Sequence, residues 1–296
     1  MSVKEFDLCK LDTSMKSDDT ESIFLKSTSS TTGKIQLKDI TFIIPVRIDS
    51  NDRLENFNAV YNYLSKNFDT NIIVYESDSY SKLKNIVKND VTFIYEKNES
   101  EVFHRTKYLN YMLNMVTTTI TANYDVDIIL PIESYIKARD HIVNDEIELL
   151  YPYQKGAFQH KINNNGRVKL LETNSIESLN NDDFTQKNVS SECGHCQFFN
   201  TTSYKKYGWE NENFISYGPE DYERYFRFNK FKRKIIYMSG CYVYHMEHYR
   251  GNNSTKGNPH FNDNENLYNT IKNMTETELI EYYNNVEYIS KYRKVE

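Results

Sequence analysis

Residues 40–68, ITFIIPVRIDSNDRLENFNAVYNYLSKNF, decide the fold class. The stretch begins with a continuous apolar run, Ile40–Val46, which is typical of a buried strand. The segment Arg53–Phe68 follows directly and carries apolar residues three and four positions apart, as on one face of a helix. A buried strand followed by an amphipathic helix is the first half of a parallel βαβ unit.

The same alternation continues along the chain. Further predicted elements are strands at Asn71–Tyr75 and Val91–Tyr95 and helices near Leu83–Val87 and over Phe103–Val116. This spacing predicts an α/β fold, with a mostly parallel central sheet flanked by helices. Ligands bind at the carboxyl ends of the strands in such sheets, and Arg47, Glu76 and Asp78 follow predicted strands there.

Beyond Pro131 the pattern is less regular. Residues 163–188 carry clusters of Asn, Asp and Gly, so we expect a long surface excursion there. Ile235–Tyr244 predicts one late strand, and Glu276–Tyr292 predicts a polar, peripheral helix. We therefore expect three regions: a polar N-terminal extension over 1–38, one α/β domain over 39–262, and a helical tail over 263–296.

Bulk composition limits the class of partner. The formal net charge of the 296 residues is -6, so no general basic field exists to hold nucleic acid. No apolar stretch approaches the roughly 20 residues that span a bilayer, and the start, MSVKEFDLCK, lacks the apolar centre of a signal peptide. Four cysteines do not indicate a disulfide scaffold. We expect a cytoplasmic protein, which is compatible with peripheral association at the inner face of a membrane.

Two carboxylates stand one residue apart in YDVDIILP, residues 124–131. Asp-x-Asp alone is a weak motif, and a solvated turn explains it equally well. At the end of a strand, however, Asp125 and Asp127 can turn toward the same crevice. Carboxylate oxygens there suit Mn²⁺ or Mg²⁺, with the phosphates of a substrate completing the coordination.

A second cluster follows the late strand. His245-Met246-Glu247-His248 places two imidazoles three residues apart. Histidine is a common metal ligand, and a mixed Asp and His shell suits Mn²⁺ better than Mg²⁺. Alone, the pair is more typical of hydrogen-bonded surface histidines; together with Asp127 it favours a metal site.

A third cluster consists of two acids after a turn. Gly218-Pro219 predicts the turn, and Glu220 and Asp221 then open a helix through Phe226. Acids at a helix start are favoured by the helix dipole, which explains them without any function. The alternative is a general base that takes a proton from an acceptor hydroxyl.

Taken together and in this order, the motifs resemble the glycosyltransferases of the GT-A fold. The β1,4-galactosyltransferases and the C-terminal segment of the polypeptide N-acetylgalactosaminyltransferases are the most similar members. The resemblance runs roughly from Ile40 to His248 and rests on six segments: IIPVR (43–47), FHRTKYLN (103–110), DVDIILP (125–131), CGHCQFF (193–199), FISYGPED (214–221) and HMEH (245–248).

The resemblance implies an inverting transfer of galactose, N-acetylgalactosamine or N-acetylglucosamine from a UDP-sugar to a hydroxyl of a glycan or glycolipid, in surface polysaccharide or glycan synthesis. It implies Asp127, His245 and His248 as ligands of Mn²⁺ or Mg²⁺, and Asp221 as catalytic base beside Glu220. Residues expected at the nucleotide sugar are Pro45, Arg47, Asp49, Glu76, Asp78, Phe103, Arg105, Asp125, Gly194 and His195. Residues expected at the acceptor are Trp209, Tyr217 and Gly218. The sequence departs from the family at Tyr217, where the family has Trp, and at Gly218-Pro219 and Gly194-His195, where it has Gly-Gly, which leaves the sugar open.

Several alternatives stay open. A non-catalytic GT-A domain that binds a sugar nucleotide or glycan carries the same motifs, and a nucleotidyltransferase shares the metal and nucleotide but releases pyrophosphate. Cys193-Gly194-His195-Cys196 matches a thiol–disulfide site, although no thioredoxin-sized unit surrounds it. Cys9 and Cys241 lack the second CxxC spacing of a zinc site. Asp78 is also compatible with a helix cap. Tyr222–Phe228 permits base stacking, which the acidic charge opposes.

Overall fold

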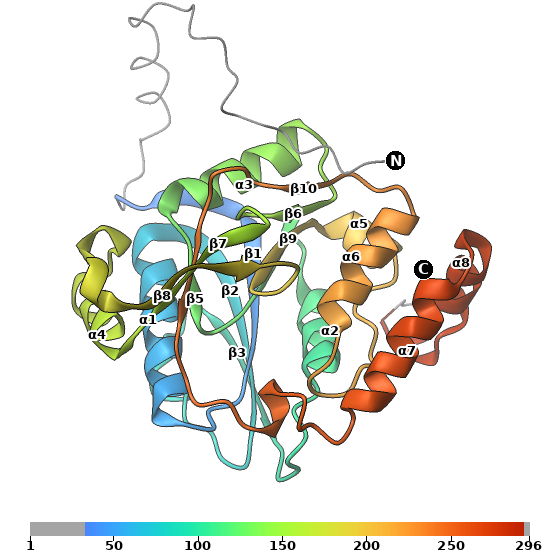
Figure 1. Cartoon of the computed structure of the whole chain (residues 1–296), viewed down its shortest axis with the longest axis horizontal. Coiled ribbons are helices and arrows are strands. Elements are labelled where there is room, and N and C mark those ends of the chain that lie inside the picture. The colour runs from blue at the N-terminus through green and yellow to red at the C-terminus, as the bar shows by residue number, and fades with distance from the viewer. Residues whose placement is uncertain (1–32, 293–296) are drawn as a thin grey trace, which may run out of the picture.

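The computed structural model describes residues 33–292 and is built around a seven-stranded sheet (Figure 1). Its strands run in the order β10-β6-β9-β4-β1-β2-β3. Their bounds are β1 (Ile35–Val46), β2 (Phe68–Asp78), β3 (Thr92–Lys97), β4 (Ile120–Tyr124), β6 (Leu149–Tyr151), β9 (Cys196–Asn200) and β10 (Ile235–Tyr237). Only β9 is antiparallel to its neighbours, β4 and β6. The predicted α/β fold with a mostly parallel central sheet is therefore confirmed.

Helices flank this sheet, and Figure 1 shows α1 and α2 on either side of strands β1 to β3. The helices are α1 (Asn51–Asn67), α2 (Arg105–Met115), α3 (Ile132–Asn144), α4 (Asn164–Thr173), α5 (Thr201–Lys206), α6 (Glu220–Lys230), α7 (Phe261–Asn273), α8 (Glu276–Asn285) and α9 (Glu287–Ser290). The Ser50 side chain caps α1 by accepting from the backbone N–H of Arg53, which fixes where the chain turns from β1 into the helix. Between sheet and helices lies an aromatic core in which Phe42 packs edge-on against Tyr124 and Phe198.

A second, smaller sheet brings distant parts of the chain together. It contains β5 (Ile128–Ile129), β7 (Gly156–Ile162), β8 (Phe184–Ser191) and β11 (Val243–Met246), in the order β5-β11-β7-β8. Residues Ile128 and His245 are paired in the antiparallel ladder of β5 and β11. The backbone N–H of Met246 also donates to the carbonyl of Asp127 at 2.7 Å. This register places the acidic motif directly beside the histidine motif.

The structure differs from the predicted elements in several places. Strand β1 begins at Ile35, five residues before the predicted start, and the remainder of the predicted extension, residues 1–32, lies outside the described part. The predicted late strand over Ile235–Tyr244 was wrong as one element, because it divides into β10 and β11 in two different sheets. The surface excursion predicted for residues 163–188 contains helix α4 and the start of β8.

The helix predicted near Leu83–Val87 was also wrong, since that segment forms only turns. Glu76 at the end of β2 accepts from the backbone N–H of Lys82 at 2.7 Å and ties this turn to the strand. The tail is helical as predicted but is broken between α8 and α9, and its Leu279 and Ile289 are buried. No helix within residues 33–292 is long and apolar enough to cross a membrane.

Candidate functional site

A cleft of about 350 Å³ opens where the strands of the large sheet end. Parallel strands β1 and β4 present their carboxyl ends at this edge, and antiparallel β9 presents its beginning there. The predicted residues that line the cleft are Pro45, Arg47, Asp49, Phe103, Arg105, Asp125, Asp127, Gly194, His195, Tyr217, Glu220, Asp221, His245 and His248. The three sequence clusters therefore face one space.

One part of the cleft is a group of three side chains with metal-ligand chemistry. Ligand atoms of Asp127, His245 and His248 all lie within 4.8 Å of one another. Nε2 of His248 is 3.0 Å from Asp127 Oδ2, and Nε2 of His245 is 3.7 Å from Asp127 Oδ1. The pairing of β5 with β11 places His245, on β11, beside Asp127, which directly precedes β5.

The electrostatics of this group fit a divalent cation. Burial lowers the pKa of His245 to about 3, so at neutral pH its imidazole is uncharged and carries a free lone pair. Its buried Nδ1 has no hydrogen-bond partner among the described residues. Burial opposes ionisation of Asp127, but His245, His248 and Arg53 together lower its pKa well below the usual range, so it is a carboxylate. One carboxylate and two imidazoles form a donor set that suits a divalent first-row transition metal, Mn²⁺ among them.

The ring of His248 is held from behind. Its Nδ1 lies 2.5 Å from the carbonyl of Tyr249 and 3.1 Å from Nη2 of Arg53. The carbonyl is the shorter contact, and a proton donated to it leaves Nε2 free to bind a cation. Arg53 also lies 3.5 Å from Asp127 Oδ2, so the carboxylate is shared between the ligand group and an arginine of α1.

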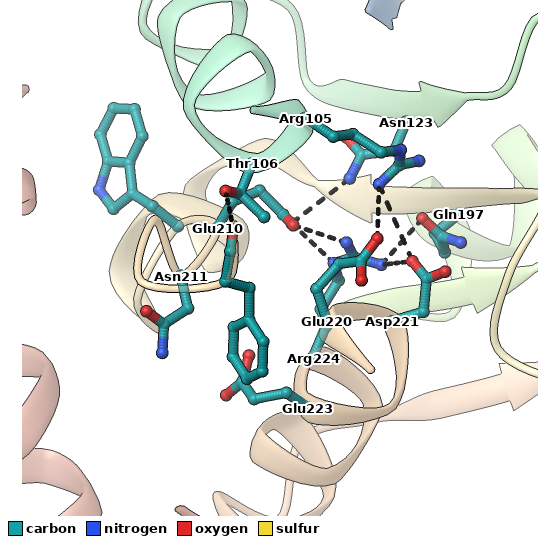
Figure 2. A network of polar contacts seen from close by, with 12 residues as sticks. Arg105, Thr106, Asn123, Gln197, Glu210, Asn211, Glu220, Asp221, Glu223 and Arg224 are labelled. Carbon is teal, nitrogen blue, oxygen red and sulfur yellow. Dashed lines mark hydrogen bonds and ion pairs between the residues drawn. The ribbon is translucent and has the colours of Figure 1, made fainter. Parts of the chain in front are cut away.

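The opposite part of the cleft is a cluster of acids and arginines, which Figure 2 shows from close by. Arg105 at the start of α2 donates to Asp125 Oδ1 at 2.8 Å and lies 4.0 Å from Glu220 and 3.9 Å from Asp221. Burial raises the pKa of Glu220 to about 8, with Asp221 adding to the effect, so Glu220 is protonated at neutral pH. Burial likewise raises the pKa of Asp125, against the opposing charge of Arg105.

Asp221 keeps one carboxylate oxygen for the cleft. Its Oδ1 accepts from Nη1 of Arg224 at 2.8 Å, whereas Oδ2 has no hydrogen-bond partner in the part of the chain that the structure describes. A β-carbon built on Gly194 would stand 3.6 Å from Oδ2, so the absence of a side chain there leaves room beside this oxygen. The side chain of Asp221 is 24% exposed, while that of Arg224 is 0% exposed. A reactant in the cleft therefore meets Asp221 and not the arginine behind it.

Four predicted site residues do not line the cleft. Glu76 is buried and accepts from Ser81 at 2.6 Å, and Asp78 pairs with Lys82 at 2.7 Å, so both organise the turn after β2. Trp209 is buried against Tyr292, with ring centroids 5.1 Å apart, and Gly218 packs where a β-carbon would meet Asn264 at 2.6 Å.

Sequence reasoning missed several residues that do line the cleft. They are Val46, Arg53, Val126, Ser216, Arg250, Asn253 and Ser254. Arg53 and Arg250 had a usable signal, because the first opens the helix predicted after the strand Ile40–Val46 and the second follows His248 by two residues. Asn253 had none: its Oδ1 accepts from the backbone N–H of Phe103 at 3.1 Å, a contact across 150 residues of sequence.

The thiol pair near the cleft does not have the properties of a redox site. Burial raises the pKa of Cys193 to about 11 and raises that of Cys196 well above its ordinary value. Both sulfurs are therefore thiols at neutral pH, and thiols are poor nucleophiles compared with thiolates. Cys193 instead lies 3.4 Å from the hydroxyl of Tyr237. Cys9, the other cysteine weighed for zinc, lies outside the described residues.

Neither a protein-family model nor a curated protein matches the sequence. Among solved structures, Staphylococcus aureus TarS 1–349 is similar at 15% identity and TM-score 0.48, over 81% of this chain and 68% of that one. The mannosyltransferase PcManGT from Pyrobaculum calidifontis, in complex with GDP-Man and Mn²⁺, is similar at 13% identity and TM-score 0.44, over 71% of this chain. Drosophila β1,4-galactosyltransferase 7 in complex with xylobiose is similar at 12% identity and TM-score 0.41, over 68% of this chain.

The match spans 56% of the mannosyltransferase chain and 65% of the galactosyltransferase chain. Activity therefore has to be inferred from the site of this protein itself.

Proposed function

We propose that the protein is a metal-dependent glycosyltransferase that moves a sugar from a nucleotide diphosphate to an acceptor hydroxyl, with inversion at the anomeric carbon. One observation carries the proposal: the Asp127, His245 and His248 group and the free oxygen of Asp221 face the same cleft. A cleft of about 350 Å³ lies within the range of small-molecule sites.

The donor end of the site is the part near the three metal-ligating side chains. A cation bound by Asp127, His245 and His248 would supply positive charge that stabilises the departing nucleoside diphosphate. Arg53 and Arg250 line the same part and place fixed positive charge beside the phosphates.

The reaction needs a base on the other side of the sugar. Oδ2 of Asp221 accepts the proton of the acceptor hydroxyl while the oxygen of that hydroxyl bonds to the anomeric carbon. The bond from that carbon to the diphosphate oxygen breaks, and the diphosphate leaves with the bonding electrons. Attack opposite the leaving group inverts the configuration. Protonated Glu220, next to Asp221, adds no second negative charge to the base at neutral pH.

We infer a UDP-sugar donor carrying galactose, N-acetylgalactosamine or N-acetylglucosamine, and a glycan or glycolipid acceptor in surface polysaccharide or glycan synthesis. Support comes from the order of the six motifs and from their convergence on one cleft. Phe103 lies in that cleft, with the guanidinium of Arg47 5.7 Å from its ring centroid, and offers an aromatic face for a nucleobase.

A donor screen tests the proposal. The protein is incubated with Mn²⁺, each common nucleotide sugar and a panel of glycan acceptors, and released nucleotide is measured. Release of UDP together with a glycosylated acceptor supports transfer. A parallel incubation contains nucleoside triphosphates and sugar 1-phosphates, and pyrophosphate release there, without transfer from any nucleotide sugar, indicates a nucleotidyltransferase. Nucleotide-sugar binding without turnover indicates a non-catalytic domain. Either result overturns the proposal.

A further inference from the structure

We propose that Glu210 and Arg224 are positioning residues that hold the carboxylate of Asp221 in the orientation it needs to take the acceptor's proton. The inference rests on the proposed function. Neither residue lines the cleft, so neither meets a substrate. Both act through Asp221.

Arg224 donates hydrogen bonds to both Glu210 and Asp221, along different edges of its planar guanidinium (Figure 2). Nε donates to Glu210 Oε1 at 2.6 Å and Nη2 donates to Glu210 Oε2 at 2.5 Å, which is a two-pronged arginine–carboxylate pair. Nη1 then donates to Asp221 Oδ1 at 2.8 Å and to Gln197 Oε1 at 3.1 Å. A guanidinium fixed along one edge cannot turn, so the N–H that reaches Asp221 has a defined direction.

Glu210 is itself fixed by helix α2 and the end of the large sheet. Its backbone N–H donates to Asn110 Oδ1 at 2.8 Å, and Asn110 Nδ2 donates to its carbonyl at 3.0 Å. The hydroxyl of Tyr204 donates to the Glu210 carboxylate. Arg224 and Glu210 thus connect Asp221, on helix α6, to helix α2 and to Tyr204, which hold its position from outside α6.

The division of contacts explains how a base can be held and still accept a proton. Glu210 takes the two-pronged side of Arg224 and balances its charge, while Asp221 receives a single hydrogen bond on Oδ1. Oδ2 remains free beside Gly194. An arginine paired with Asp221 alone would stabilise the unprotonated form more strongly and make a weaker base.

Fold stability does not require this arrangement, since replacing a buried ion pair by apolar side chains of similar volume is often neutral. The chain also contains a matched pair on the same helix. Arg227 and Glu223 are equally buried and lie 2.9 Å apart, and Arg227 donates to the carbonyl of Trp209 at 2.9 Å. Within residues 33–292, neither member of this second pair forms a hydrogen bond or ion pair with Asp221. It is therefore a control for the loss of a buried arginine–glutamate pair.

The experiment compares two double variants, Glu210→Gln with Arg224→Met and Glu223→Gln with Arg227→Met. Purified wild type and variants are assayed for kcat, donor KM and melting temperature. For the first variant we expect kcat about 10- to 100-fold lower with donor KM within about twofold, because a base displaced by about 1 Å loses up to two decades of rate. For the second we expect kcat within about twofold of wild type.

A third variant, Arg224→Lys, keeps the buried positive charge and serves if the first double variant does not fold. The lysine ammonium of this variant cannot donate to both oxygens of Glu210 and also to Asp221. We therefore expect a lower kcat for Arg224→Lys as well. Wild-type kcat in Arg224→Lys, or equal losses in the two double variants, overturns the positioning role. Absence of transfer by the wild type with every donor overturns the proposed function instead, so the two failures are distinguishable.

Discussion

The two ends of the cleft handle charge in opposite ways. At one end, Asp127, His245 and His248 gather three ligand atoms, and one imidazole nitrogen there has no partner among the described residues. At the other end, Asp125 and Asp221 each accept a hydrogen bond from an arginine of the protein. The first end offers donor atoms for a divalent cation, with Arg53 3.5 Å from Asp127, and the second carries its own cations, Arg105 and Arg224. The proposed transfer would use this division, because the diphosphate needs its negative charge neutralised and the acceptor hydroxyl must lose a proton.

The largest expected effect is a loss of kcat on substitution of Asp221, at the end of the cleft that contains the arginines. Asp221→Asn removes the proton acceptor but keeps the size and the hydrogen bond to Arg224. We expect kcat to fall by about 10²- to 10⁴-fold, the usual contribution of a general base. UDP binding, measured by calorimetry in the presence of Mn²⁺, should stay within about twofold. Unchanged turnover would show that Asp221 is not the base. The two ends of the cleft would then not divide cation binding and proton transfer between them.

A large stability effect is expected from Arg105, which faces three acids. Arg105→Met removes the cation of Asp125, which also lies near Glu220 and Asp221, while Asp221 keeps its hydrogen bond from Arg224. Removing one partner of a fully buried ion pair costs about 3–5 kcal/mol; because the side chain of Asp125 is 32% exposed, we expect a loss of at most about 3 kcal/mol, measured by urea denaturation. Arg139→Met is a matched control, because the side chain of Arg139 is 36% exposed against 15% for Arg105. A loss no greater than that of the control would contradict the view that the acids depend on protein cations.

A smaller, pH-dependent effect is expected at Glu220. The folded protein holds a proton there up to a pKa of about 8, whereas the unfolded chain releases it near 4.5. The contribution of Glu220 to stability is therefore full below pH 4.5 and falls as pH rises through about 8. Glu220→Gln should match the wild type in acid and become the more stable of the two above pH 8. Melting curves at several pH values measure this, and a pH-independent difference would refute it.

The smallest effect is expected at the thiols. Cys193 is protonated at neutral pH because burial raises its pKa to about 11, and it contacts neither end of the cleft. We expect Cys193→Ala to keep kcat within about twofold, with or without a reducing agent. A rate that responds to the redox state of the wild type, and loses that response in the variant, would restore the thiol–disulfide alternative.

Local pattern explains which parts of the fold were predictable. Ile40–Val46 predicts a strand and Arg53–Phe68 predicts a helix, because the spacing of apolar residues can be read within each segment alone. Leu83–Val87 has similar local spacing but forms turns, which local spacing alone does not reveal. Within Ile235–Tyr244, Ser239-Gly240 marks a turn, with Gly240 at a φ of 71°, but the pairing of the two halves in separate sheets depends on distant strands.

The candidate site shows the same limit. Asp127 and His248 can be picked out because each lies in a short motif of ligand-forming residues. Glu210 and Arg224 carry no motif, and their pairing depends on how Asn110 of helix α2 fixes the backbone of Glu210. The resemblance placed Trp209 at the acceptor, but the structure buries it against Tyr292. Burial of this kind is set by tertiary packing and not by the neighbouring sequence.

Manganese binding tests the central claim, that early and late parts of the chain form one cation site. Electron paramagnetic resonance measures free Mn²⁺ as it is titrated into the wild type, Asp127→Ala, His248→Ala and Asp221→Asn, each with UDP present. We predict that the wild type and Asp221→Asn take up Mn²⁺ equally, and that Asp127→Ala and His248→Ala each bind it at least about tenfold more weakly. Undiminished uptake by either of those two variants would contradict the account.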